Sequence, residues 1–274
     1  IVWLALFACL AFALWRSGSW QRKTLYALLV VLSFLAPAAP GIYRDFEYRQ
    51  RYAKAKALFD ERCKTAGEHV IRRVEEVDGV LLANVRPDDR AANRANPNWA
   101  NAGLPSEAGG ADYIRSFLSW EHKQYANQRG YLNSEPTNPS GFVVSRGYRF
   151  VDVIEADGLV YRYRFVRPPG AELSRTLVTG QRARYVVSFV NTYDPEERAL
   201  WVAGTTVKIN DAQSGELIAS KTWFSIEPGQ GSLGGTRAPW GFAKTCPDLT
   251  GSAERSPTRY FVDQILKPIH AEQS

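Results

Sequence analysis

The chain of 274 residues carries 34 Lys and Arg against 28 Asp and Glu, a formal net charge of +6, and 45% of its residues are hydrophobic. This composition excludes an intrinsically disordered chain, a small disulfide-rich domain and a transporter built of many helices. Half of the net charge comes from Arg16, Arg22 and Lys23, because residues 1–40 contain no acid; the nearly balanced remainder offers no concentrated basic stripe for a nucleic acid.

Two uncharged apolar runs, residues 1–15 and 24–40, flank the polar segment 16–23. As helices they span roughly 22–25 Å at about 1.5 Å per residue, slightly less than the roughly 30 Å of the bilayer core. We predict a transmembrane helical hairpin over residues 1–40, with the segment 16–23 in the cytoplasm. The rest of the chain is then expected in the periplasm of a Gram-negative bacterium.

Two alternatives fit this segment less well. A cleavable signal peptide would use Arg22-Lys23 and residues 24–35, but it leaves an apolar run ahead of its basic region and puts prolines at its cleavage site. A buried hairpin in a soluble protein is disfavoured by the absence of charge in both runs. Basic residues after the second run oppose the predicted orientation under the positive-inside rule: Arg44, Arg49, Arg51, Lys54 and Lys56.

Residues 44–66 are predicted to form one helix. Tyr48, Tyr52, Ala55, Phe59 and Cys63 recur every three or four residues, which makes a single apolar stripe. A juxtamembrane helix within residues 41–67 would lead the chain away from the bilayer. Its basic side chains would either contact anionic lipid headgroups or form a solvated face.

Strands are predicted to dominate residues 68–274. They cover residues 69–74, 80–85, 148–156, 159–165, 183–191, 199–209 and 217–226. Short connections leave no room for crossover helices, and Asp157-Gly158 is a hairpin signal, so we expect an antiparallel meander of at least five strands. Polar loops over residues 86–110 and 121–141, a helical turn over 112–120 and a helix over 256–266 complete an α+β domain with a mainly antiparallel sheet.

Only two cysteines lie beyond the first apolar run, which contains Cys9. If the domain is periplasmic, Cys63 and Cys246 are predicted to form a disulfide that closes a loop of about 180 residues. Loop entropy gives such a bridge an upper stabilisation of roughly 4–5 kcal/mol. In a reducing compartment two separate buried thiols are expected instead.

No familiar catalytic or metal-binding motif is present. His69, His122 and His270 lack the spacing of a helical zinc pair, and there is no Cys-x-x-Cys. Residues 229–234 match a dinucleotide-binding glycine pattern, but residues 239–241 interrupt the helix that such a site needs, so we predict a loop. The sequence therefore predicts no catalytic residue, no metal and no cofactor.

Aromatic side chains are the remaining candidates for partner contacts, because such residues supply much of the energy at interfaces. We predict contacts for Trp99, which lies in a polar loop, and for Trp120, His122 and Trp240. The same side chains would also suit a sheet core. The strand residues Trp201 and Trp223 are assigned to the core.

Several short stretches of the chain form a set. They are residues 60–67 (DERCKTAG), 74–80 (VEEVDGV), 197–204 (ERALWVAG), 214–216 (SGE), 229–231 (GQG), 237–240 (RAPW), 246–247 (CP) and 261–268. As a set they resemble a family of bacterial membrane-anchored periplasmic proteins of uncharacterised activity. Such proteins resemble the immunity or accessory proteins found beside secretion-system toxins. The resemblance also implies the pairing of Cys63 with Cys246, and it implies no catalytic residue.

These features predict an inner-membrane-anchored periplasmic binding protein. We expect an immunity protein that occludes a secreted antibacterial toxin with the two polar loops and Trp99. The alternative is a structural or assembly component of an envelope complex, and a third is a hydrolase or transferase with a site of scattered residues. The expected partners are a protein and, through residues 1–40, a membrane.

Overall fold

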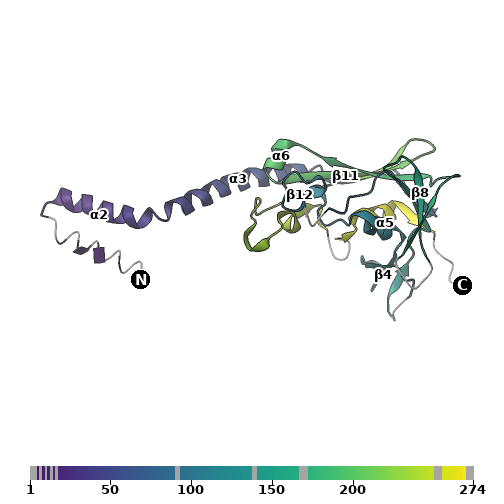
Figure 1. The fold of residues 1–274 in the computed structure, drawn as a ribbon, viewed down its shortest axis with the longest axis horizontal. Helices are drawn as coiled ribbons and strands as arrows, with labels where there is room; N and C mark the ends of the chain where they lie inside the picture. The colour runs from purple at the N-terminus through teal and green to yellow at the C-terminus, as the bar shows by residue number, and fades with distance from the viewer. Residues whose placement is uncertain are drawn as a thin grey trace. The chain divides into compact units, whose positions relative to one another are not determined.

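The computed structural model describes residues 5, 8–9, 11–12, 15, 18–89, 93–137, 141–166, 172–249 and 255–269 (Figure 1). The chain divides into two compact units, residues 1–53 and 54–274. The predicted divisions after residues 40 and 67 do not coincide with this boundary, because one helix runs continuously from Ala39 to Cys63.

The first unit contains helix α2 (Trp20–Leu35) and the first half of helix α3 (Ala39–Cys63). The side chain of Ser19 caps α2 by accepting a hydrogen bond from the backbone N–H of Arg22. The start predicted for α3 at residue 44 is too late. Pro40 is tolerated in the first turn of a helix, where its missing N–H leaves no bond unmade.

The segment predicted to form a membrane hairpin is described only in part. Most of the first apolar run, with Arg16, lies outside the described residues. No single described helix has both the length and the apolar content to cross a bilayer, whereas α2 and α3 meet these criteria as a pair that is bent by 63° at the break between them.

The second unit is built around a mixed sheet, nine-stranded within the described residues, in the order β1-β12-β11-β10-β3-β7-β8-β9, with β13 beside β12. Its strands are β1 (Gly67–Val70), β3 (Gly79–Leu82), β7 (Phe150–Ile154), β8 (Val160–Phe165), β9 (Leu173–Leu177), β10 (Tyr185–Thr192), β11 (Val202–Asp211), β12 (Leu217–Ile226) and β13 (Lys244–Cys246). This architecture confirms the α+β class.

The predicted single meander is wrong. Strand β3 lies between β7 and β10, parallel to both, and so separates two antiparallel meanders. All four residues of β3 are buried, as expected for a strand covered on both faces. The strands near Asp78-Gly79 have distant partners: β1 pairs with β12, and β2 (Val74–Val77) pairs with β14 (Leu266–Pro268).

Two helices pack with the sheet in one hydrophobic core. They are α5 (Gly110–Leu118) and α7 (Pro257–Ile265), and α7 confirms the helix predicted over residues 256–266. Trp223 of β12 meets Phe261 of α7 edge to face at 6.1 Å, which confirms the core position predicted for this tryptophan. Trp201 is only partly buried and precedes β11 with a positive φ of 55°.

The predicted loop 121–141 contains two strands of a second sheet, and the third strand follows it. Strands β4 (Trp120–Lys123), β5 (Tyr131–Asn133) and β6 (Val143–Ser145) pair antiparallel in the order β5-β4-β6. The loop 86–110 contains the 3-10 turn η1 (Ala100–Gly103). The segment after β10 forms the short helix α6 (Pro195–Ala199), which the carboxylate of Asp194 caps.

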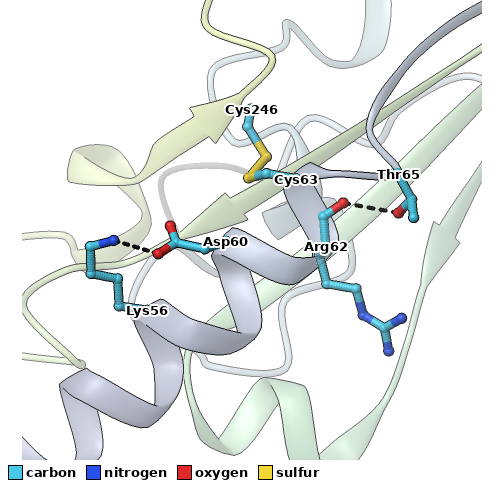
Figure 2. Close-up of a disulfide and its surroundings, with 6 residues drawn as sticks. All are labelled: Lys56, Asp60, Arg62, Cys63, Thr65 and Cys246. Carbon is cyan, nitrogen blue, oxygen red and sulfur yellow. Dashed lines mark hydrogen bonds and ion pairs between the residues drawn. A yellow bond between two sulfur atoms is a disulfide. The ribbon is translucent and has the colours of Figure 1, made fainter.

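The predicted disulfide is confirmed. Figure 2 shows Cys63, in the last turn of α3, bonded to Cys246 in β13, with 5.7 Å between their Cα atoms. Beside it, Arg62 donates from Nε to the Glu197 carboxylate on α6 at 2.7 Å. The covalent bond and the ion pair both hold the end of α3 to the sheet domain.

Candidate binding cleft around Arg146

Two cavities adjoin the small sheet β4–β6, and Arg146 lines both of them. The first, of about 450 Å³, lies between this sheet and the α7–β14 segment. The second, of about 240 Å³, is bordered by Trp120, the end of β8 and the chain around Tyr148. We call the two cavities together the Arg146 cleft.

Residues around the small sheet β4–β6 position the wall of the cleft that this sheet forms. Ser119 ends α5 in an extended conformation, so β4 begins at once with Trp120. The Glu121 carboxylate accepts a hydrogen bond from the backbone N–H of Gly130 at 2.9 Å, which joins β4 to the turn before β5. After Arg146 the chain passes so close to the end of α5 that a Cβ on Gly147 would lie 2.5 Å from the carbonyl oxygen of Leu118. Glycine at this position therefore lets Arg146 stand at the rim.

The first cavity has two arginines without an anionic partner. Lys123 pairs with Glu121 at 3.0 Å and Lys267 pairs with Glu75 at 2.7 Å. Within the part of the chain that the structure describes, neither Arg129 nor Arg146 forms an ion pair. The Arg129 guanidinium instead lies 5.4 Å from the centroid of the Tyr260 ring.

Tyr260 of α7 lines this cavity together with Asp263 and Gln264 of the same helix. Burial, assisted by the nearby Glu121 charge, raises the pKa of Tyr260, whose hydroxyl donates to the carbonyl oxygen of Gly130. Arg259 lies fully buried on the same helix, donates from Nε to the carbonyl oxygen of Ser116, and pairs with Asp263. Burial lowers the pKa of Arg259.

The second cavity combines apolar walls with further arginines. The Arg146 guanidinium lies 5.7 Å from the centroid of the Trp120 ring, a cation–π arrangement. Leu118, Pro136, Tyr148, Phe165 and Val166 supply the other walls. Arg149 pairs with Asp78, and Arg164 stands over the Phe150 ring.

The cleft is positively charged as a whole. Its basic lining residues are Lys123, Arg129, Arg146, Arg149, Arg164 and Lys267, and its acidic ones are Glu121, Glu135 and Asp263. The chain beyond residue 40 is nearly balanced, so this excess is local. The arrangement can bind an anionic group beside an apolar one.

Three of the four residues predicted to contact a partner are buried, which matches the alternative that such side chains belong to a core. Trp99, Trp240 and His122 are at most 2% exposed. The indole N–H of Trp99 donates to Asp89 and that of Trp240 to the carbonyl oxygen of Asn96, both at 2.9 Å. These bonds fold the polar loop onto the sheet as a small second core. Trp120 alone is partly exposed, and it lies in the cleft.

In the glycine loop over residues 229–234, backbone N–H groups are bound by a carboxylate of the same chain. The buried Glu227 carboxylate accepts hydrogen bonds from the backbone N–H groups of Gly229 and Gly231 at 2.8 and 2.7 Å, and it pairs with Arg237. Two 3-10 turns follow, η2 (Gly234–Thr236) and η3 (Pro239–Phe242). The loop predicted here is confirmed, and two of its backbone N–H groups are already bonded to the Glu227 carboxylate.

No group of three or more His, Cys, Asp or Glu side chains in the described ranges is arranged to hold a metal ion. His270 lies outside the described residues. Comparisons of the chain with protein-family models, curated proteins and solved structures found no match. The family resemblance therefore stays an expectation, and function has to be argued from the site.

Sequence patterns did not identify Arg129, Arg146 or Tyr260. These residues come from a turn, a strand end and a helix that are distant in sequence, and only the fold brings them together. The alternation of arginine with aromatic residues over 161–165 was the available signal. It marks β8, whose Arg164 and Phe165 line the second cavity.

Proposed function

We propose that this protein is a membrane-anchored periplasmic binding protein that neutralises a secreted antibacterial toxin by occlusion. The observation that carries the proposal is the pairing of Arg146 with Trp120 between two cavities. Tryptophan and arginine are the residue types most enriched among the dominant contacts of protein interfaces. The positively charged cleft is therefore the proposed contact surface for the protein partner.

The exposed side chains of α2 support the membrane anchor. The helix has no buried residue, and Leu25, Leu28, Leu29, Leu32 and Leu35 are each more than half exposed. An apolar surface of this kind requires lipid or a partner to cover it. Trp20 and Tyr43 are the residue types found at the water–lipid interface.

The disulfide supports a periplasmic location for the sheet domain. Cys63–Cys246 joins the helix that leaves the proposed anchor to the sheet domain. Such bonds persist in oxidising compartments such as the periplasm. An anchor in the inner membrane and a domain in the periplasm would place the cleft where an incoming toxin acts.

Occlusion requires only a complementary surface and no chemistry by this chain. The fold shifts the proposed contact from Trp99, which is buried, to Trp120 and the sheet β4–β6. A partner covering the Arg146 cleft would bury Trp120 and neutralise the rim arginines. The toxin would be inactive as long as its own site faces this surface.

Co-expression with the product of the adjacent gene tests this function. We expect that product, directed to the periplasm, to stop growth, and the full chain to restore growth and co-purify with it. Arg146→Glu combined with Trp120→Ala should reduce protection. Lys208→Glu, at an exposed position of β11 outside both cavities, should not.

Two outcomes contradict the immunity proposal. One is an adjacent product that is harmless in the periplasm. The other is a toxic product that forms no complex with the chain. Stable co-purification with an envelope machine without any protection would favour the assembly role instead.

A further inference from the structure

We infer that the Arg146 cleft recognises an extended acidic segment, with carboxylates at Arg129 and Arg146 and an apolar side chain in the second cavity. This inference rests on the proposed function, since the segment belongs to the protein partner. It adds the chemistry by which the partner is selected.

The two rim arginines call for an anion. Arg149, Lys123 and Lys267 each have a carboxylate partner. Arg129 and Arg146 form no ion pair among the described residues, and each guanidinium lies over an aromatic ring. A guanidinium presents a fork of N–H donors that matches a carboxylate in two parallel hydrogen bonds. A carboxylate on each arginine would therefore complete both ion pairs.

The rings position these arginines in advance. Arg129 lies over Tyr260 and Arg146 lies over Trp120, at 5.4 and 5.7 Å from the ring centroids. A side chain already held against a ring loses less conformational freedom when it binds a ligand. Arg146 is also half-buried, so an ion pair there is less screened than one on the open surface.

The second cavity selects for an apolar group beside the charge. Its volume of about 240 Å³ is smaller than the roughly 300–1,000 Å³ of cavities for drug-sized ligands. Its walls include Trp120, Phe165 and Val166. This size and lining suit one large apolar side chain, and Arg146 connects it to the carboxylate site.

The charge pattern favours a protein segment over a lipid surface. Glu121, Glu135 and Asp263 are interspersed with the basic residues. They would repel a continuous layer of phosphate groups, whereas the spaced carboxylates of a peptide can avoid them. We therefore commit to an acidic peptide segment as the occupant.

The test uses the full chain in a zwitterionic detergent and a fluorescein-labelled peptide of three glutamates and one leucine, read by fluorescence anisotropy. We expect the glutamine analogue of this peptide to bind at least tenfold more weakly. Arg129→Glu combined with Arg146→Glu should weaken binding of the glutamate peptide at least tenfold. The control Lys208→Glu should leave the affinity for this peptide unchanged. Lysine at both positions should give an intermediate loss, because an ammonium cannot form the paired hydrogen bonds.

Several results would overturn the inference. They are equal binding of the glutamate and glutamine peptides, full affinity in the double variant, or displacement of the peptide by free glutamate, inorganic phosphate or phosphatidylglycerol vesicles at a matched charge concentration. If the double variant fails to fold, Arg129→Gln and Arg146→Gln tested singly carry the same comparison.

Failure of the inference differs from failure of the proposed function. A double variant that still protects against the adjacent product would sink the acidic-segment inference and the contact surface proposed at Arg146, while the immunity function itself would stand. Selective peptide binding without any protection would keep the site and remove the immunity function.

Discussion

Asp211, the last residue of β11, is a buried carboxylate that two arginines hold in place. Arg184 donates to both of its oxygens, with the shortest bond at 2.6 Å, and Arg72 donates at 2.9 Å. The backbone N–H of Gln213 adds a further bond at 3.0 Å. The Arg184 guanidinium, with the Gln213 N–H and Arg72, holds the pKa of Asp211 well below its usual range, although burial opposes this shift.

This depressed pKa predicts acid sensitivity. A carboxyl whose pKa is lower in the folded state contributes its full stability above its unfolded value, about 3.9, and loses it as the pH falls towards the folded value. We expect Asp211→Asn to lower the free energy of unfolding at neutral pH and to flatten its decline below about pH 4. Urea unfolding of the full chain in detergent, followed by tryptophan fluorescence across a pH series, measures both effects.

In Asp211→Asn, the free energy of unfolding should still fall with decreasing pH, but less steeply. Arg175 lowers the pKa of Glu155, so this residue continues to add acid sensitivity in the variant. Parallel pH profiles for Asp211→Asn and the natural chain would refute the role assigned to Asp211.

At the scale of elements, helix α7 depends on a cap from a distant loop. Its own N-cap residue, Ser256, makes no side-chain cap bond. The buried Glu107 carboxylate accepts the backbone N–H of Thr258 at 3.0 Å instead, together with the hydroxyl of the same residue. The charge of Glu107 also favours the charged form of Arg86, whose pKa burial lowers. One carboxylate thus joins the loop 86–110 to the helix that floors the cleft.

Glu107→Ala is expected to destabilise the domain by about 2–4 kcal/mol, because it uncaps α7 and leaves the Arg86 charge without nearby compensation. Glu107→Gln keeps an acceptor and should cost less. Chemical denaturation of the full chain measures both variants against Glu196→Ala, which removes an exposed carboxylate. A loss for Glu107→Ala no larger than that of the control would exclude the capping role.

The elements that sequence patterns predicted are those with local signals. The stripe ending at Cys63 identified α3, Asp157-Gly158 identified the β7–β8 turn with Gly158 at a φ of 77°, and residues 256–266 identified α7. The position of β3 was missed because its partners lie far away in the sequence and pair with it in parallel. The strands β4–β6 were missed because they have only three or four residues, and β5 and β6 also follow polar segments.

At the scale of the whole molecule, positive charge is concentrated in two places, the N-terminal segment and the Arg146 cleft. The basic head explains half of the net charge, and the balanced remainder still gathers six basic residues around one cleft. Composition alone could not place that cleft, because its basic residues are scattered between positions 123 and 267. Of the candidate contact residues, only Trp120 lines the cleft. Trp99, Trp240 and His122 are buried elsewhere in the domain.

The proposed function depends most on the compartment of the domain, and counting free thiols tests that directly. The full chain is produced in Gram-negative cells, acid-quenched, denatured and treated with a maleimide that carries a polyethylene glycol. We predict one modified cysteine, Cys9, before reduction and three after it. The variant Cys63→Ser should show two without reduction. Three modified cysteines in the unreduced natural chain would place the domain in a reducing compartment and contradict the periplasmic account.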